Sequence, residues 1–226
     1  MKDKVVVVTG AFGALGRAVA DAAAVQGARV AAIDFAPPPG LALNIGADAF
    51  VEGGVNLADE AHAARVFGAI AQKYGRIDAL ANIAGGFSWS KVADAPADLW
   101  DRLNTINLKT ALNASRAALT HGVSAILNVG ANGALKAAPG MGPYAASKSA
   151  VHRLTEALAE EHKEAGVRVN AVLPSILDTP ANRADMPDAD FTKWVAPGDL
   201  AGIILFLLSD DANPITGALI PVTGRV

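Results

Sequence analysis

The sequence predicts a doubly wound α/β fold, in which helices cover both faces of a mostly parallel sheet. Short apolar, β-branched runs such as Val5–Val8 alternate with longer segments of helical periodicity along the chain. Parallel strands need crossover connections, usually helices, so this alternation favours a parallel sheet. A glycine-rich turn directly after the first run is typical of such folds. Because 52% of the 226 residues are hydrophobic, one sizeable core can form, and we expect a single domain over residues 1–226.

Each expected element has a local signal. Gly27 and Gly75 follow helical stripes as stop signals, and Pro197 stands where a helix begins. The expected strands are Val5–Val8, Arg29–Asp34, Ala47–Val51, Ile77–Ala81, Val123–Val129, Val167–Leu173 and Ala218–Val222. The expected helices are Leu15–Val25, Asp59–Tyr74, Pro96–His121, one that carries Tyr144 and ends near Ala165, and Gly198–Ser209. The proline cluster at residues 37–40 predicts a loop.

Composition excludes several function classes. The 19 basic and 22 acidic residues give a net charge of -3, so the composition does not indicate a protein that binds nucleic acid. The absence of cysteine excludes disulfides, thiolate metal sites and cysteine catalysis. Neither a secretory signal nor an apolar run long enough to span a bilayer is apparent, so we expect a cytoplasmic protein without membrane contact. The four histidines have no carboxylates grouped around them, and we predict no metal site.

A glycine-rich turn follows the first expected strand, in the order Gly10, Gly13 and Gly16. Glycines there let the backbone turn tightly and approach a pyrophosphate, whose charge is met by the amino end of the next helix. An ordinary glycine-rich turn is the alternative. The position between a strand and a helix, at the start of the domain, favours a dinucleotide.

A carboxylate, Asp34, ends the second expected strand, 18 residues after Gly16. It can accept hydrogen bonds from the adenosine ribose hydroxyls, and it would repel a 2′-phosphate. Phe35 follows it, where a base would favour the phosphorylated cofactor. The sequence therefore favours NAD(H) over NADP(H), and Arg17 and Arg29 are the side chains that would reverse this preference. A simple turn-forming role for Asp34 is the competing interpretation.

Tyr144 and Lys148 stand four residues apart in an expected helix, so they lie on one face, one turn apart. A free phenol has a pKa near 10, and a nearby positive charge favours the phenolate. Tyr144 is therefore a candidate general acid/base, with Lys148 lowering its pKa. The same spacing also describes a tyrosine packed at a helix edge beside a solvated lysine, so the neighbouring motifs must decide.

Together these motifs resemble the short-chain dehydrogenase/reductase family over nearly the whole chain. The resemblance implies a small-molecule substrate and a catalytic set of Tyr144, Lys148 and Asn107, the last holding a proton-relay water. It implies that the cofactor contacts Gly10, Phe12, Gly13, Ala14, Leu15, Gly16, Asp34, Asn56, Leu57, Asn82, Ala84, Gly85, Tyr144, Lys148, Pro174, Leu177 and Thr179. Several of these positions depart from the usual pattern, among them Ala14 for a glycine and Asn56 for an aspartate. Relatives in this family form dimers and tetramers through the helices expected at 96–121 and around Tyr144, so a homodimer or homotetramer is implied.

Ala131 is the departure with the largest consequence. The family's catalytic serine usually lies thirteen residues before the tyrosine, and alanine cannot donate a hydrogen bond to a substrate oxygen. Losing one such donor typically slows an enzyme about a hundredfold or more. Either the chain is impaired on ordinary ketones, or its substrate does not need that donor, or a neighbour such as Asn132 replaces it.

A narrower resemblance, to the dihydropteridine reductases, offers a reason. Segments 140–144, 150–154 and 177–191 resemble those enzymes, which also carry alanine at the serine position and use NADH to reduce a quinonoid pterin. Asn107 agrees instead with the broader family. The resemblance implies hydride transfer between the nicotinamide and a carbonyl, an alcohol or a quinonoid imine.

The substrate pocket is expected between a short lid at residues 180–195 and apolar walls formed by Phe87, Trp89, Ala131, Met141 and Trp194. Simple core packing of the apolar side chains is the alternative. Two other functions stay open: a protein that binds NAD(H) but turns over little because of Ala131, and a structural subunit of an assembly.

Overall fold

The computed structural model describes residues 1–38 and 43–226, which fold around one seven-stranded parallel sheet. The strand order is β3-β2-β1-β4-β5-β6-β7, and every neighbouring pair is parallel, which confirms the predicted fold class. The strands are β1 (Val5–Thr9), β2 (Arg29–Ile33), β3 (Phe50–Glu52), β4 (Ala79–Asn82), β5 (Ala125–Val129), β6 (Arg168–Pro174) and β7 (Leu219–Val222). The helices are α1 (Ala14–Val25), α2 (Glu60–Tyr74), α3 (Ala97–Asn104), α4 (Thr110–Leu119), α5 (Gly142–His162), α6 (Pro180–Asp185) and α7 (Pro197–Leu208).

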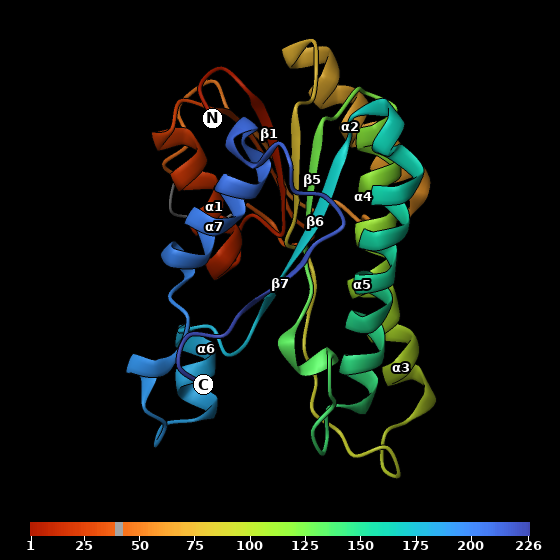
Figure 1. Ribbon diagram of the computed structural model, residues 1–226, viewed down its shortest axis with the longest axis vertical. Helices are drawn as coiled ribbons and strands as arrows, with labels where there is room; N and C mark the ends of the chain where they lie inside the picture. The colour runs from red at the N-terminus through yellow and green to blue at the C-terminus, as the bar shows by residue number, and fades with distance from the viewer. Residues whose placement is uncertain (39–42) are drawn as a thin grey trace.

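Helices cover the sheet on both sides (Figure 1). The side chains of β1 alternate between two cores, because successive residues of a strand point to opposite faces. Val6 and Val8 join the core beneath α1 and α7, whereas Val5 and Val7 join the core beneath α2, α4 and α5. Coverage on both faces explains why a run of four valines is fully buried.

The strand order reverses at β1, which places the site. Val6 of β1 is in register with Val30 of β2 on one side and with Ala79 of β4 on the other. The connections leave these neighbouring strands in opposite directions, so the loops that follow their carboxyl ends diverge. In open α/β sheets, ligands bind in the crevice at this point.

The long helix expected at 96–121 is interrupted. Residues Thr105–Lys109 form a π-helical turn between α3 and α4, with Asn107 at its centre. Apolar periodicity does not reveal one extra residue in a turn, and π turns occur often at functional sites.

Two other expectations differ in detail. The third strand is Phe50–Glu52 rather than Ala47–Val51, because its pairing begins where Phe50 lies opposite Ala31. In the predicted proline loop, residues 37 and 38 have no regular structure, and residues 39 and 40 lie outside the described residues.

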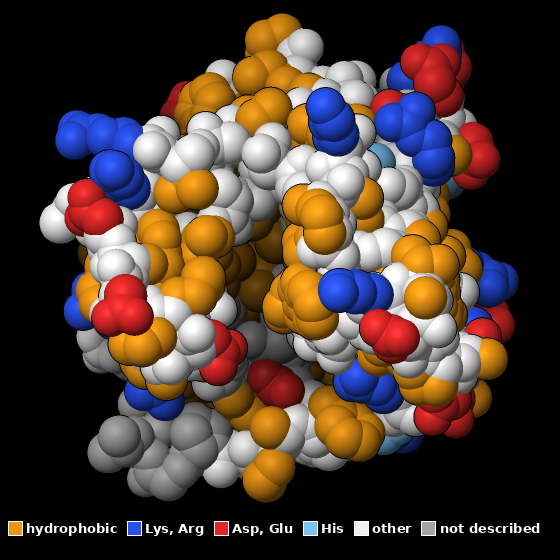
Figure 2. All heavy atoms as spheres, turned by 90° about the horizontal axis from the view of Figure 1, so that it is seen from below, with side chains coloured by type: hydrophobic (Ala, Val, Ile, Leu, Met, Phe, Trp, Pro, Cys, Tyr) orange, Lys and Arg blue, Asp and Glu red, His pale blue; other side chains and the backbone are white. Residues whose placement is uncertain are grey.

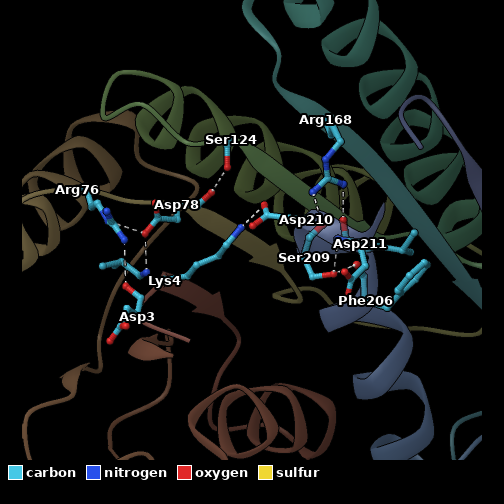
Figure 3. Close-up of polar contacts among 12 residues, drawn as sticks. Asp3, Lys4, Arg76, Asp78, Ser124, Arg168, Phe206, Ser209, Asp210 and Asp211 are labelled. Atoms are coloured by element: carbon cyan, nitrogen blue, oxygen red, sulfur yellow. Dashed lines mark hydrogen bonds and ion pairs between the residues drawn. The ribbon is translucent and has the colours of Figure 1, made fainter. Parts of the chain in front are cut away.

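The amino edge of the sheet is tied together by charged side chains (Figure 3). Asp78 accepts a hydrogen bond from the Val5 amide at 2.7 Å and forms an ion pair with Arg76. Lys4 forms an ion pair with Asp210. Arg168 is nearly buried and donates to the Leu207 and Ser209 carbonyls at 2.6 and 2.8 Å, which caps the carboxyl end of α7. These contacts join the beginnings of several strands and leave the carboxyl edge for the site.

Candidate active site at the carboxyl edge of the sheet

A cleft of about 810 Å³ opens at the carboxyl edge, beside the point where the strand order reverses. Figure 2 shows the molecule hollowed on this side. Of the residues predicted to bind the cofactor, the cleft is lined by Gly10, Phe12, Gly13, Ala14, Leu15, Gly16, Asp34, Asn56, Leu57, Ala84, Gly85 and Thr179. The sequence prediction missed Phe35, Ala36, Val55, Ala58, Ile83, Thr105, Ile106 and Thr110, which also line it. Most of these missed residues are sequence neighbours of predicted ones.

The glycine turn brings backbone amides to the cleft. Gly10 has φ +64°, and a Cβ atom on Gly16 would lie 2.0 Å from the Gly10 carbonyl oxygen, so both positions require glycine. Gly13 precedes α1 without a side-chain cap. The first amides of α1 therefore have no intrahelical acceptor and no capping side chain, and they meet the needs of a pyrophosphate.

Asp34 fixes this turn from the end of β2. Its two carboxylate oxygens accept hydrogen bonds from the Phe12 amide at 2.8 Å and the Ala36 amide at 3.0 Å. The second lone pair on each oxygen can accept a hydrogen bond from a ribose hydroxyl. Arg29 lies at the opposite, amino end of β2, too far along the strand to contact a ligand beside Asp34.

Asn56 lies at the exposed rim of the cleft, where its side-chain oxygen accepts from the Ala58 amide at 3.1 Å. Asn82, by contrast, is buried behind the site. Its amide group donates to Ser115 at 3.0 Å and to Asn128 at 2.9 Å, so it braces β4 against β5 rather than lining the cleft.

Tyr144 and Lys148 lie on one face of α5, as the spacing predicts. The Lys148 ammonium is buried and donates to the Val129 carbonyl at 2.7 Å, and burial lowers the pKa of Lys148 to about 8. The Tyr144 ring stands edge-on to Phe87, with centroids 4.9 Å apart. Burial raises the pKa of the Tyr144 phenol to about 12. This direction is opposite to the lowering expected from the sequence, because burial removes water from around the phenolate and so disfavours the charged form.

Asn107 is held within the π turn by protein groups. Its side-chain oxygen accepts from the Gly86 amide at 2.9 Å, and its side-chain nitrogen donates to the Gly86 carbonyl at 3.0 Å and to Ser147 at 2.9 Å. Both donors of the amide group are therefore used. A water at Asn107 would have to use the second lone pair of the side-chain oxygen or the backbone carbonyl.

Gly85 joins the catalytic candidates to the cleft. A Cβ atom there would lie 2.5 Å from the Asn107 side-chain oxygen and 3.3 Å from the Lys148 ammonium. Gly85 also lines the cleft. The cleft therefore lies next to two of the three predicted catalytic residues, Lys148 and Asn107.

The family model described as short chain dehydrogenase matches residues 4–190. The chain belongs to the short-chain dehydrogenase family. The 2-(S)-hydroxypropyl-CoM dehydrogenase 3 of Xanthobacter autotrophicus (strain ATCC BAA-1158 / Py2) is 34% identical, over 99% of this chain and 96% of that protein. The meso-2,3-butanediol dehydrogenase of Serratia marcescens is 32% identical, over 98% of this chain and 94% of that protein. The structure of a xylitol dehydrogenase with bound NAD⁺ is similar with a TM-score of 0.89 at 25% identity, covering 99% and 98% of the two chains. As a member of this family, the protein is an oxidoreductase.

Ala131, which stands where the family usually carries its catalytic serine, is buried. Ala131 is 4% exposed, follows β5 in extended conformation, and presents no polar side-chain atom. Its amide donates to the Nε2 atom of His152 at 3.3 Å. Asn132, the side chain considered as a replacement, is partly exposed at the start of a short 3₁₀ turn.

The apolar residues expected to form the walls of the substrate pocket differ in exposure in this short-chain dehydrogenase. Phe87 and Trp89 are exposed, and Trp89 packs so closely on Gly140 that a Cβ atom there would lie 2.0 Å from the indole. Met141 immediately precedes α5. Trp194 is only 8% exposed and packs its ring against Phe191, which makes it a support of the lid more than a surface of the pocket.

The expected lid contains α6 and a short 3₁₀ turn, Phe191–Lys193. A parallel bridge between Leu177 and Val195 closes its base, and the Thr179 hydroxyl caps α6 by accepting from the Asn182 amide. The Leu177 carbonyl accepts from the Asn182 side chain at 2.8 Å. Pro174 ends β6 and is buried. Pro174 and Leu177, both predicted to contact the cofactor, are not among the residues that line the main cleft.

Within residues 1–38 and 43–226, no three His, Cys, Asp or Glu side chains gather in a way that would hold a metal ion. No helix in the same residues combines the length and apolar character needed to cross a bilayer.

Proposed function

We propose that this chain transfers hydride between NAD(H) and the carbon of an alcohol, a ketone or a conjugated imine, with Tyr144 as the general acid/base. The observation that carries the proposal is the meeting of two features at Gly85: the cleft with its amide-lined glycine turn, and the buried Lys148 and Asn107. The relatives described above are named dehydrogenases of small hydroxylated compounds, which supports the same reaction class.

The residues present fit a nicotinamide dinucleotide. The bare Gly13 and the uncapped start of α1 suit a pyrophosphate, and Asp34 suits a ribose diol. When bound, the nicotinamide supplies or accepts the hydride.

The protein groups supply the proton and the orientation. A phenol with a pKa of about 12 is neutral throughout the physiological range, so Tyr144 acts as a proton donor to an oxygen or nitrogen on the substrate. The Nζ atom of Lys148 lies close to both the Val129 carbonyl and Gly85. There it holds the ribose next to the nicotinamide, and it stabilises the phenolate that forms when Tyr144 gives up its proton. Asn107 fixes Gly86 and Ser147 around this pair and, with a water, returns a proton to the phenolate. This arrangement favours reduction at neutral pH, with oxidation increasing as the pH rises.

The preference for NAD(H) rests on Asp34. Its carboxylate is held at the cleft by two backbone amides, so a 2′-phosphate beside it would meet a fixed negative charge. Fluorescence titration should give tighter binding of NADH than of NADPH, and Asp34→Asn should reduce this ratio at least tenfold. Tighter binding of NADPH by the wild type would refute the cofactor assignment.

The buried, apolar Ala131 favours a second candidate, a quinonoid dihydropterin, because reduction of that conjugated imine does not depend on the serine donor. A panel of ketones, aldehydes, quinones and quinonoid dihydropterin, tested with NADH, would separate the candidates. We expect Ala131→Ser to raise kcat on ketones roughly tenfold or more, since one oxyanion donor typically contributes at least that much. Turnover of the pterin alone, without gain in Ala131→Ser, would identify a pteridine reductase. No turnover of any substrate, despite NADH binding, would leave only a cofactor-binding protein.

We also propose that two or four copies assemble through the helices on the α4 side of the sheet. There α3, α4 and α5 form a layer that no other element of the described residues covers (Figure 1). A small hollow of about 240 Å³ on this layer is lined by Trp100, Asp101, Asn104, Pro143, Ala146 and Ser147. Light scattering after size exclusion would test this assembly. A monomer with full activity would refute it without affecting the catalytic proposal.

A further inference from the structure

His152 is a buried imidazole on the same face of α5 as the two catalytic candidates. It follows Lys148 by one helical turn and Tyr144 by two, and it is 2% exposed. Its Nε2 atom accepts a hydrogen bond from the Ala131 amide at 3.3 Å. The ring therefore reaches the backbone position at which the family carries its serine.

Two hydrogen bonds from α5 hold the same short backbone segment. Lys148 donates to the Val129 carbonyl, and two residues later the Ala131 amide donates to His152. Between them, Gly130 lies flat against the imidazole: a Cβ atom there would be 2.6 Å from Nε2 and 2.5 Å from a methyl group of Leu173. The absence of a side chain at Gly130 is what allows the ring to approach the backbone this closely.

We propose that His152 is a positioning residue for the reaction, which fixes the Val129–Ala131 backbone and thereby the carbonyl on which the Lys148 ammonium rests. This inference rests on the proposed function, because it assigns a role in the same site. With a methyl group at Ala131, the side chain offers no polar contact that would orient this segment. The imidazole supplies the orientation by accepting the hydrogen bond of the backbone amide.

The bond requires the neutral imidazole with its proton on Nδ1, because Nε2 must accept. Burial lowers the pKa of His152 below its ordinary 6.5, and the charges of Arg153 and Lys148 on α5 lower it further. The contacts from β5 and β6, at Gly130, Ala131 and Leu173, are backbone and apolar atoms without charge. The acceptor is therefore present at neutral pH, and protonation in acid converts it into a donor that faces another N–H group.

Two variants separate positioning from simple packing. In His152→Gln, the side-chain oxygen lies about as far along the chain as Nε2 and retains an acceptor that does not titrate. His152→Leu fills similar volume without an acceptor. We expect His152→Leu to lower kcat for NADH-dependent reduction about tenfold with KM changed less than threefold, and His152→Gln to stay within threefold of the wild type. Protonation of His152 should lower kcat of the wild type in acid. This decline should be absent in His152→Gln, because the glutamine side chain does not titrate.

The control measurements are the melting temperature and the NADH dissociation constant, which should be similar in the two variants. Equal kcat in the wild type and both variants would overturn the inference, and so would an equal loss in both variants, since that loss would report packing alone. Nitrogen-15 NMR of the imidazole tests the geometry without turnover. The Nδ1–H tautomer is expected, and the Nε2–H tautomer would overturn the inference even if the wild type proves inactive. Inactivity together with NADH binding would by itself refute only the proposed function.

Discussion

Replacing Lys148 by methionine should reveal the free-energy cost of burying its ammonium. Burial lowers the pKa of Lys148 from 10.5 to about 8 in the folded protein, whereas the unfolded chain keeps the ordinary value. Between these two pH values the unfolded state binds more protons, so the stability of the wild type rises with pH. From pH 7 to pH 10, the free energy of unfolding of the wild type should rise by about 2 to 3 kcal/mol relative to Lys148→Met.

The assay is urea unfolding at pH 7, 8, 9 and 10, followed by far-ultraviolet circular dichroism. Loss of the bond to Val129 in Lys148→Met costs stability at every pH and therefore does not change the slope. The raised pKa of Tyr144 lowers stability only as the pH rises from about 10 to about 12, and it acts in both proteins. Replacing the exposed Lys136 by methionine serves as the control. A constant difference between wild type and Lys148→Met over this range would refute the assignment of a desolvated ammonium.

Two further substitutions test the fold, one in the glycine turn of the site and one at the amino edge of the sheet. Gly16→Ala should weaken NADH binding more than tenfold and lower stability by roughly 2 to 4 kcal/mol, because its Cβ would lie 2.0 Å from the Gly10 carbonyl oxygen. Gly202→Ala, whose Cβ would meet no atom within 4 Å, is the matched control, and a similar loss there would contradict this reasoning. Arg168→Leu should lower the free energy of unfolding by roughly 2 to 4 kcal/mol, because two carbonyls lose a charged donor in a nearly buried position. Arg116→Leu, which breaks only an exposed ion pair, should cost less than about 1 kcal/mol in the same denaturant titration, and equal losses would refute the capping role.

The parts of the site that could be predicted from sequence are those that local chemistry determines. The valine run of β1, the turn that begins at Gly10 and the Tyr144–Lys148 spacing each carry their signal within a few residues. Sheet topology then brings them together, because parallel strands end at a common edge. The place of the cleft beside Asp34 follows from the same rule.

Other features depend on contacts that no short window contains. The π turn around Asn107 is maintained by bonds to Gly86 and Ser147, which lie 21 and 40 residues away. The contact between His152 and Ala131 spans 21 residues. The helical spacing of Tyr144, Lys148 and His152 was a usable signal that His152 shares their face of the helix. The predicted direction of the Tyr144 pKa shift was wrong. Sequence spacing shows only that a charged residue is near, whereas desolvation depends on all the groups that surround the phenol.

The role of Tyr144 as general acid is tested by separating cofactor binding from chemistry in Tyr144→Phe. NADH binding is measured by fluorescence titration, and hydride transfer by single-turnover absorbance with a substrate found in the panel. We predict a dissociation constant for NADH within about threefold of the wild type and hydride transfer slowed a hundredfold or more, as expected for loss of a general acid. Hydride transfer at the wild-type rate would contradict the account, because the proton would then come from a group other than Tyr144.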